Sequence, residues 1–433
     1  MTLQVIEADL TWTGRRFEPG VRIAVGADGR ISAVGALGRP PTLRLTRRAL
    51  LPGFVNAHSH GFQRALRGGG ERFPRGAGSF WTWREAMYGL VQSLDREAAR
   101  RAYVQAFGEM RDAGITTVGE FHYLHHAGDA ADYALDAVVL EAADSVGIRL
   151  ALLNTFYALG GVGRPLEGVQ RRFRSESLEA YWTQMDRLER LRDPALQSLG
   201  VVAHSIRAVS LADIAALHAE AGRRGLRFHM HVEEQVAEVE ESVAAYARRP
   251  MAALLGAVAI DGNLTAVHCT HTAPDEMASF LGAGGTVCVC PLTEANLGDG
   301  LPALELPHAA GALSLGTDSN ARISFLEEMR WLEYGQRLRL KRRGVLADQE
   351  GSAARTLLAV ATTGGAAALG VESGRIEAGR WADLVALDLD APELAGLDGE
   401  HLLDGLVFGA GGSAVWGTAV GGVWRRRGDP LPS

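Results

Sequence analysis

Eight short apolar runs along the chain each end in polar side chains that can bind a metal ion or transfer a proton. The runs cover residues 49–60, 116–125, 148–157, 199–207, 226–234, 264–271, 285–296 and 312–320. Helical patterns fill the intervals between them. A near-continuous apolar run is typical of a buried parallel strand, and strands that alternate with helices indicate repeated βαβ units. Eight such units predict an α/β protein with a closed, TIM-like (β/α)₈ barrel.

The polar ends of these runs hold most of the residues with useful chemistry. Ten of the thirteen histidines lie in these runs or, in the case of His126, directly after one. In a (β/α)₈ barrel the carboxyl ends of the strands form the mouth of the active site. We therefore expect the polar residues at these positions to take part in catalysis or binding.

The chain is longer than a simple barrel requires. Its 433 residues exceed the roughly 250 of a typical (β/α)₈ barrel. Residues 1–50 and 371–433 alternate short β-like runs with glycine turns. These two ends are predicted to form one small composite β-sandwich domain beside a catalytic barrel of residues 51–370.

Composition and charge exclude several other classes of protein. The net charge is −7 and no basic run is longer than three residues, as at Arg425–Arg427, which argues against a nucleic-acid partner. Three cysteines, two of them on one predicted strand, do not make a disulfide framework and fit a cytoplasmic protein. The N-terminus lacks the pattern of a secretory signal. Residues 405–424 are uncharged, but their glycines favour a hairpin over a membrane span.

A candidate metal site follows from the ends of three strands. His58 and His60 stand two residues apart, so their side chains share one face of the first strand. Alone, this pair is more typical of ordinary hydrogen-bonded histidines than of a metal site. His231 closes the fifth strand and Asp318 the eighth, and Asp318 could also accept a proton from bound water. Three imidazoles and a carboxylate suit one divalent ion, most simply Zn²⁺, with Fe²⁺ as the alternative.

The position of the only lysine favours a single metal ion. Some metallohydrolase barrels bridge two metals through a carboxylated lysine after the fourth strand. Here that strand ends in His204, Ser205 and Arg207, while Lys341 follows the eighth strand. We therefore predict a mononuclear site.

Several roles near this site stay open at the level of the sequence. His229 shares a face with His231, and we prefer His231 as the ligand. Glu234 could reach a metal-bound water, or could be a solvated loop charge as expected for Glu233. His268 ends the sixth strand, where it could stabilise developing charge or bond to a neighbouring strand.

Four motifs together resemble the amidohydrolase superfamily, in its mononuclear deaminase branch. They are Leu-Pro-Gly-Phe-Val-Asn-Ala-His-Ser-His (51–60), His231 with Glu234, His268, and Gly-Thr-Asp-Ser (316–319). Residues 374–385 also resemble the return of such chains into their β domain. The resemblance covers nearly the whole chain and implies a metal-dependent hydrolase.

Local stretches resemble a narrower group, the enzymes that hydrolyse N-formimidoyl-L-glutamate to N-formyl-L-glutamate and ammonia in histidine degradation. The stretches are 58–65, 79–88, 120–126, 203–209, 293–300 and 330–338. One departure is Asn320, where this group leads us to expect a histidine. That difference puts the polarity of the pocket beside Asp318 in doubt.

The resemblance implies a dicarboxylate substrate held by arginines. The planar fork of arginine binds a carboxylate in bidentate fashion. Arg84 lies in a long glycine-rich segment, 61–84, and such loops often act as lids. The residues expected around the substrate are Gln63, Arg84, Tyr123, His204 and Arg207.

The expected mechanism is hydrolytic, and two other functions compete with it. Metal-activated water would attack the formimidoyl carbon and lose its proton to Asp318 or Glu234. Glu234 would protonate the departing nitrogen while His268 holds the attacking oxygen. The alternatives are a deaminase of a purine, pyrimidine or triazine ring, and an inactive barrel that serves as a binding protein. The two arginines argue against a ring substrate, and the complete set of metal ligands argues against an inactive barrel. A homodimer is compatible with a barrel of this kind.

Overall fold

The computed structural model describes residues 4–73, 78–304 and 312–432. All eight apolar runs form strands, which join in chain order in one parallel sheet. The strands are β6 (Phe54–Ser59), β7 (Ile115–His122), β8 (Arg149–Phe156), β9 (Gln197–Ser205), β10 (Phe228–Val232), β11 (Leu264–His268), β12 (Thr286–Val289) and β13 (Leu313–Leu315). Every residue of β6, β7 and β8 is buried, which explains why they read as continuous apolar runs.

The sheet closes where its last strand, β13, meets its first, β6. Ser59, the last residue of β6, forms a parallel bridge with Asp318, which lies just beyond β13. The backbone N–H groups of Thr317 and Asp318 both donate to the His58 carbonyl at 3.0 Å, and the His60 N–H donates to the Asp318 carbonyl at 2.9 Å. The expected (β/α)₈ barrel is therefore present and nearly closed, and three candidate metal ligands lie on its seam.

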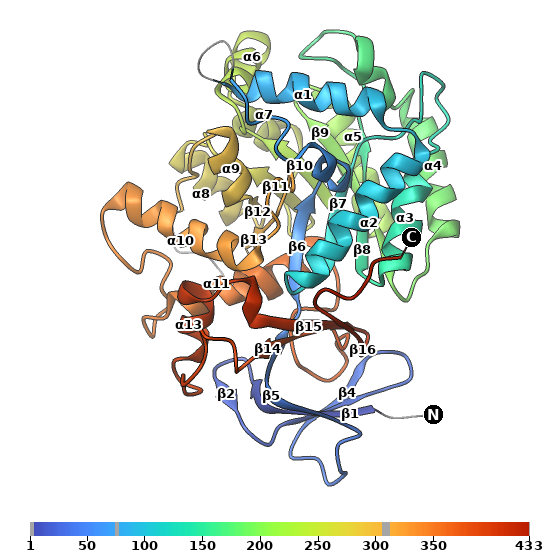
Figure 1. Cartoon of the computed structure of the whole chain (residues 1–433). Coiled ribbons are helices and arrows are strands. Elements are labelled where there is room, and N and C mark those ends of the chain that lie inside the picture. The colour runs from blue at the N-terminus through green and yellow to red at the C-terminus, as the bar shows by residue number, and fades with distance from the viewer. Residues whose placement is uncertain (1–3, 74–77, 305–311, 433) are drawn as a thin grey trace.

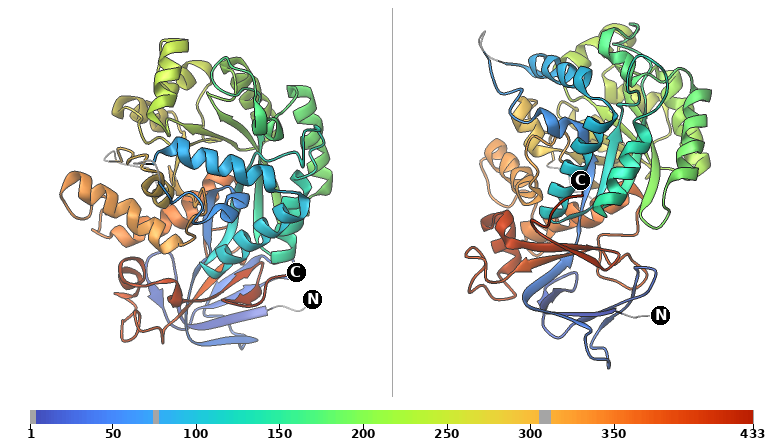
Figure 2. Two further views of the ribbon diagram at one scale, coloured as in Figure 1. Left: turned by 45° about the horizontal axis from the view of Figure 1, so that its top comes forward. Right: turned by 45° about the vertical axis from the view of Figure 1, so that its right-hand side comes forward.

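Helices surround the strands of the barrel (Figures 1 and 2). In chain order they are α2 (Arg96–Asp112), α3 (Asp136–Val146), α4 (Leu178–Leu191), α5 (Leu211–Arg224), α6 (Val236–Tyr246), α7 (Pro250–Ala257), α8 (Pro274–Gly282), α9 (Pro291–Leu297), α10 (Phe325–Leu340), α11 (Ala353–Ala359) and α12 (Gly365–Leu369), with the short turns η1 (Gly61–Leu66), η2 (Gly168–Phe173) and η3 (Val360–Gly364). Helix α1 (Phe80–Ser93) lies across the carboxyl ends of the strands, at the top of Figure 1.

Local chemistry sets the limits of these helices. Ser210 caps α5 by accepting a hydrogen bond from the Asp213 N–H at 3.1 Å, and Gly225 ends the same helix at a φ of 68°. Asp95 caps α2 in the same way, with the Ala98 N–H at 2.7 Å. A polar cap satisfies a free backbone donor, and glycine adopts the left-handed conformation at little cost.

Both ends of the chain meet in a second, mixed sheet below the barrel in Figure 1. Its order is β16-β15-β14-β5-β1-β3-β4, and β2 pairs with β1. The strands are β1 (Gln4–Trp12), β2 (Phe17–Glu18), β3 (Arg22–Val25), β4 (Ile31–Gly35), β5 (Leu43–Pro52), β14 (Leu384–Asp388), β15 (Val415–Val420) and β16 (Val423–Arg426). The antiparallel pairing of β5 with β14 joins the two chain ends, as expected.

The uncharged stretch 405–424 does not form a long helix. It contains the end of α13 (Leu402–Gly409), the turn η4 (Gly412–Ala414) and the hairpin of β15 and β16, in agreement with the sequence. Across the described ranges, no helix combines the length and apolarity that crossing a bilayer requires. The three cysteines are free and buried.

Candidate active site and metal centre

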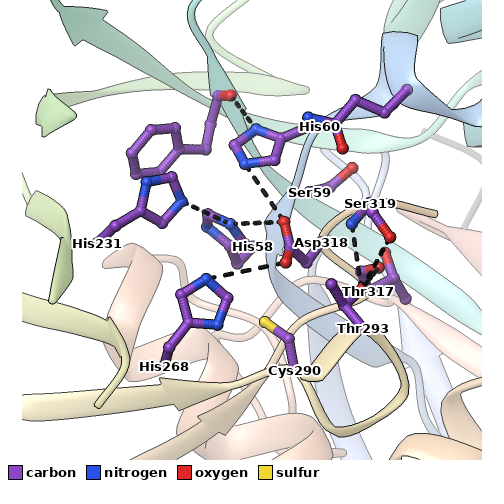
Figure 3. A network of polar contacts seen from close by, with 12 residues as sticks. His58, Ser59, His60, His231, His268, Cys290, Thr293, Thr317, Asp318 and Ser319 are labelled. Carbon is purple, nitrogen blue, oxygen red and sulfur yellow. Dashed lines mark hydrogen bonds and ion pairs between the residues drawn. The ribbon is translucent and has the colours of Figure 1, made fainter. Parts of the chain in front are cut away.

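Four side chains converge at the carboxyl end of the barrel (Figure 3). The Nε2 atoms of His58 and His60 each lie 3.3 Å from Oδ1 of Asp318. His231, from β10, places its Nε2 atom 3.2 Å from Nε2 of His58. All four side chains are at least nine-tenths buried. The structure thus brings together the four residues that the sequence suggested as metal ligands.

The protonation of these groups calls for a cation between them. Nδ1 of His60 lies 2.8 Å from the Phe121 carbonyl, which only accepts, so His60 carries its proton on Nδ1. Burial lowers the pKa of His60 to about 3, so the ring is neutral. Its Nε2 lone pair therefore faces a carboxylate oxygen of Asp318. Two facing acceptors repel each other unless a metal ion lies between them, and an imidazole whose other nitrogen donates to a carbonyl is a typical metal ligand.

The two histidines of β10 have different surroundings. His231 faces His58, whereas His229 places its Nε2 atom 3.0 Å from the carbonyl of Ala368 on α12. The His229 ring is fully buried in that contact. The geometry therefore agrees with the preference for His231.

His268 lies between three carboxylates. Its Nδ1 atom is 3.3 Å from Glu294, and its Nε2 atom is 3.8 Å from Asp318 and 3.9 Å from Glu234. Burial alone would lower the pKa of His268, but these three acidic groups raise it to about 10. The ring therefore presents an N–H toward the space beside Asp318.

Unusual backbone conformations set the direction of these side chains. Glu233, His268 and Asp318 have φ values of 53°, 73° and 44°, which residues other than glycine seldom adopt. Glu233 was expected to be a solvated charge, and that prediction is wrong: its carboxylate is fully buried and accepts the Met251 N–H at 3.1 Å. Because Glu233 is anchored on the far side, Glu234 turns toward His268.

A cavity opens in front of the cluster, beneath α1. Its walls contain every predicted substrate-binding residue and most of the candidate ligands. The lining includes His60, Gln63, Trp81, Trp83, Arg84, Tyr88, Tyr123, Tyr157, Arg164, His204, Arg207, His231, Glu234, Glu241, His268 and Asp318. Trp81 and Trp83 pack against Phe80 of the same helix and also line this cavity.

Arg207 connects the cavity to the acidic residues near the cluster. Its guanidinium lies 3.3 Å from Glu234 and 3.5 Å from Glu238. Glu238 is fully buried, and burial raises its pKa to about 7 although Arg207 opposes the change. Arg207 is thus held by two carboxylates while its side chain lines the cavity.

Arg84 reaches the cavity from a helix, whereas the sequence suggested a glycine-rich loop. A capping box starts α1: the Ser79 N–H donates to Thr82 Oγ1 at 3.0 Å, and Thr82 Oγ1 donates back to the Ser79 carbonyl at 2.8 Å. Residues 74–77 of the expected lid segment lie outside the described residues. The Arg84 guanidinium donates through Nε to the Tyr88 hydroxyl at 2.7 Å.

The remaining predicted residues form polar contacts around the same space. Gln63 Nε2 donates to the Tyr123 hydroxyl at 2.7 Å, and His204 Nδ1 lies 3.1 Å from Ser205 Oγ. Sequence reasoning missed Tyr88 and Tyr157. The sequence carries a signal for both residues, since Tyr157 closes an apolar run and Tyr88 ends the stretch 79–88.

Asn320, the departure from the expected histidine, joins the two sides of the barrel seam. Its amide nitrogen donates to Ser59 Oγ at 3.1 Å, and its amide oxygen accepts from Thr317 Oγ1 at 2.6 Å. Its φ of 55° suits asparagine, one of the few residues that tolerate this conformation. Asn320 therefore stabilises the turn that presents Asp318.

Comparison with known proteins agrees with this geometry. The model of the amidohydrolase family matches residues 49–425. A formimidoylglutamate deiminase from Pseudomonas aeruginosa is 41% identical over 93% of this chain and 90% of that protein. The crystal structure of an amidohydrolase from Brucella melitensis has a TM-score of 0.89 at 34% identity, covering 97% of this chain and 94% of that one. An adenosine deaminase from Xanthomonas campestris with bound zinc has a TM-score of 0.80 at 26% identity, covering 98% and 93%. The chain therefore belongs to the amidohydrolase family of metal-dependent enzymes, and it is a hydrolase that acts on carbon–nitrogen bonds.

Proposed function

We propose that this enzyme hydrolyses N-formimidoyl-L-glutamate to N-formyl-L-glutamate and ammonia, a step of histidine degradation. The observation that carries the proposal is the contact of Arg207 with Glu234 in a cavity that Arg84 also lines. A substrate with two carboxylates needs two cationic groups, and its amidine needs a proton donor between them and the metal site. The Pseudomonas aeruginosa relative supports the same substrate.

The chemistry divides among residues 51–370, which we take as the catalytic unit. His58, His60, His231 and Asp318 would hold one divalent ion, for which zinc is our choice because imidazole and carboxylate are ligands that it favours. When bound, such an ion makes water acidic enough to supply hydroxide near neutral pH.

The protein groups bind the substrate, orient it and move protons. Arg207 and Arg84 bind the two carboxylates, with Gln63, Tyr123 and His204 around the chain between them. Water adds to the formimidoyl carbon, and Asp318 or Glu234 takes its proton. Glu234 delivers a proton to the terminal nitrogen of the protonated amidine, which leaves as ammonia, and Asp318 takes the second proton of the water from the oxygen as the C=O bond forms. The Nε2–H of His268 stabilises the negative charge that develops on the attacking oxygen.

The test is ammonia release by zinc-loaded enzyme from three compounds. N-Formimidoyl-L-glutamate is compared with N-formimidoyl-glycine, which lacks the second carboxylate, and with adenosine as a ring substrate. Rapid release from the glutamate derivative alone is the expected result. Release from adenosine, or from neither formimidoyl compound, would overturn the proposal.

A further inference from the structure

Tyr88 lies on α1 in the wall of the cavity, and the proposed reaction assigns it no role. Its hydroxyl oxygen receives two hydrogen bonds, from Arg84 Nε at 2.7 Å and from Gln170 Nε2 at 3.2 Å. The orientation of the Gln170 amide is fixed, because its Oε1 accepts the Glu167 N–H at 3.0 Å. Both nitrogens that face Tyr88 can therefore only donate.

The two hydrogen bonds that Tyr88 accepts determine where its own hydroxyl proton points. A phenol has one O–H donor and an oxygen that accepts. Arg84 and Gln170 use the accepting side of Tyr88, so its proton must point to a different partner. Among the described residues, no hydrogen bond gives that proton an acceptor. The Tyr88 hydroxyl is thus a donor with a fixed direction at the surface of the cavity.

The Arg84 guanidinium beside Tyr88 also has N–H donors that need an acceptor. It packs against the rings of Tyr88 and Trp81, at 5.1 Å and 5.4 Å from their centroids, and within the described ranges it pairs with no carboxylate. Tyr157 lies close to Arg84 and keeps its hydroxyl proton, since burial raises the pKa of Tyr157 to about 12. Arg84, Tyr88 and Tyr157 therefore each present a hydrogen-bond donor on this side of the cavity.

A surface that presents three neighbouring donors favours ligand groups that only accept. A carboxylate supplies oxygen acceptors to all of them, whereas an amide or an amino group would place a donor against a donor and leave both without a partner. Arg207 is the cation next to Glu234, so it would take one carboxylate of the substrate. The second carboxylate would then bind to the wall of the cavity that Arg84 and Tyr88 form.

We propose that Tyr88 is a specificity-determining residue, whose O–H binds the second carboxylate of the substrate together with Arg84. This inference rests on the proposed function. It predicts that the enzyme distinguishes a terminal carboxylate from the corresponding amide through a hydroxyl group as well as through charge.

The variant Tyr88→Phe keeps the ring that packs on Arg84 and removes only the hydroxyl. We expect kcat/KM for N-formimidoyl-L-glutamate to fall about 10- to 100-fold, as for a lost hydrogen bond to a charged group. The loss should appear mainly in KM. The value for N-formimidoyl-glycine should stay unchanged, and the preference for N-formimidoyl-L-glutamate over N-formimidoyl-L-glutamine should shrink. Tyr334→Phe, on α10 outside the cavity, is the matched control.

Equal losses for the glutamate and glycine derivatives, or no loss at all, would overturn the inference. Calorimetric binding of glutarate to the zinc-loaded enzyme gives a measurement independent of turnover, and Tyr88→Phe should weaken it about tenfold or more. If the parent enzyme releases no ammonia from N-formimidoyl-L-glutamate, the proposed function fails. Weaker glutarate binding by Tyr88→Phe than by the parent enzyme would still support the role of Tyr88.

If Tyr88→Phe folds poorly, Gln170→Leu removes one of the two contacts that direct the phenol. It should impair the dicarboxylate selectively, and equal effects on both substrates would contradict the assignment.

Discussion

Nη2 of Arg207 lies 3.3 Å from Oε2 of Glu234, so the cation that we assign to substrate binding touches the carboxylate that we assign to proton transfer. The side chains of Arg207 and Glu234 are only 13% and 9% exposed, which makes their mutual attraction stronger than at a solvated surface. A substrate carboxylate that draws Arg207 toward itself weakens this pair.

Replacing Arg207 by lysine tests this link. Lysine keeps the charge but cannot contact Glu234 and Glu238 at once while it binds a carboxylate in bidentate fashion. Arg207→Lys should lower kcat/KM for N-formimidoyl-L-glutamate about 10- to 100-fold. Arg164→Lys is the control, because Arg164 lines the same cavity but pairs with Glu241 near the surface. Similar losses in both variants would contradict a specific role for Arg207.

Glu234→Gln should abolish turnover and leave the metal content intact. The amide keeps the shape of the side chain but cannot carry the proton, and general acid–base catalysis contributes about 10²- to 10⁴-fold to a rate. Steady-state kinetics and metal analysis of the purified variant measure the two effects. Glu241→Gln changes another acidic residue of the cavity wall and should remain active. Retained activity of Glu234→Gln would remove Glu234 from the mechanism.

The sequence predicts the barrel well because its strands are buried on both faces. Continuous burial of β6, β7 and β8 leaves a simple apolar signal, and the parallel order places all strand ends on one side. The same argument locates His58, His231 and Asp318, since each follows or ends such a run. Strand pattern alone could assemble the candidate metal cluster without any knowledge of helix packing.

Features that depend on distant partners could not be predicted in this way. His229 and His231 share a strand face, and only the contact of His229 with Ala368, far along the chain, separates them. In the sequence Glu233 resembles a loop charge, because its hydrogen bond from the Met251 N–H is visible only in the folded structure. The role of Tyr88 on α1 likewise depends on Gln170, which belongs to the distant turn η2.

Metal content should distinguish the two histidines of β10. His231→Ala removes a candidate ligand, so the protein should be purified with well under one equivalent of metal per chain. His229→Ala removes a buried contact with a carbonyl and should keep its metal despite lower thermal stability. Elemental analysis of both proteins provides the comparison. Full metal content in His231→Ala, or its loss in His229→Ala alone, would reverse the ligand assignment.

Asn320 contributes to stability through its side chain and through its backbone. Asn320→Gly removes the hydrogen bonds to Ser59 and Thr317 but tolerates the φ of 55°, at an expected cost of about 1–3 kcal/mol. Asn320→Ala loses the same bonds and adds roughly 1 kcal/mol of backbone strain. Urea unfolding of the two variants separates the contribution of the side-chain hydrogen bonds from that of the backbone conformation. An alanine variant as stable as the glycine variant would show that the backbone conformation is not retained.

A buried cluster outside the active site should control the acid stability of the barrel. Asp136 Oδ1 lies 3.0 Å from His122 Nε2 and 2.9 Å from His125 Nδ1, and Gln184 donates to its other oxygen. Burial alone would raise the pKa of Asp136, but His125 and His122 outweigh it and hold the pKa well below its usual value.

Asp136→Asn leaves this cluster without its negative charge and should lower the free energy of unfolding by about 3–5 kcal/mol at neutral pH. Because the folded-state pKa is depressed, the stabilisation is fully present above the unfolded pKa of about 4 and is lost as the pH falls through the folded value. The difference between parent and variant should therefore stay constant from neutral pH down to about pH 5 and narrow only below about pH 4. Urea unfolding across this range measures it, with the exposed Asp398→Asn as the control. A difference that narrows between pH 7 and 5 would contradict the assignment of this stabilisation to Asp136.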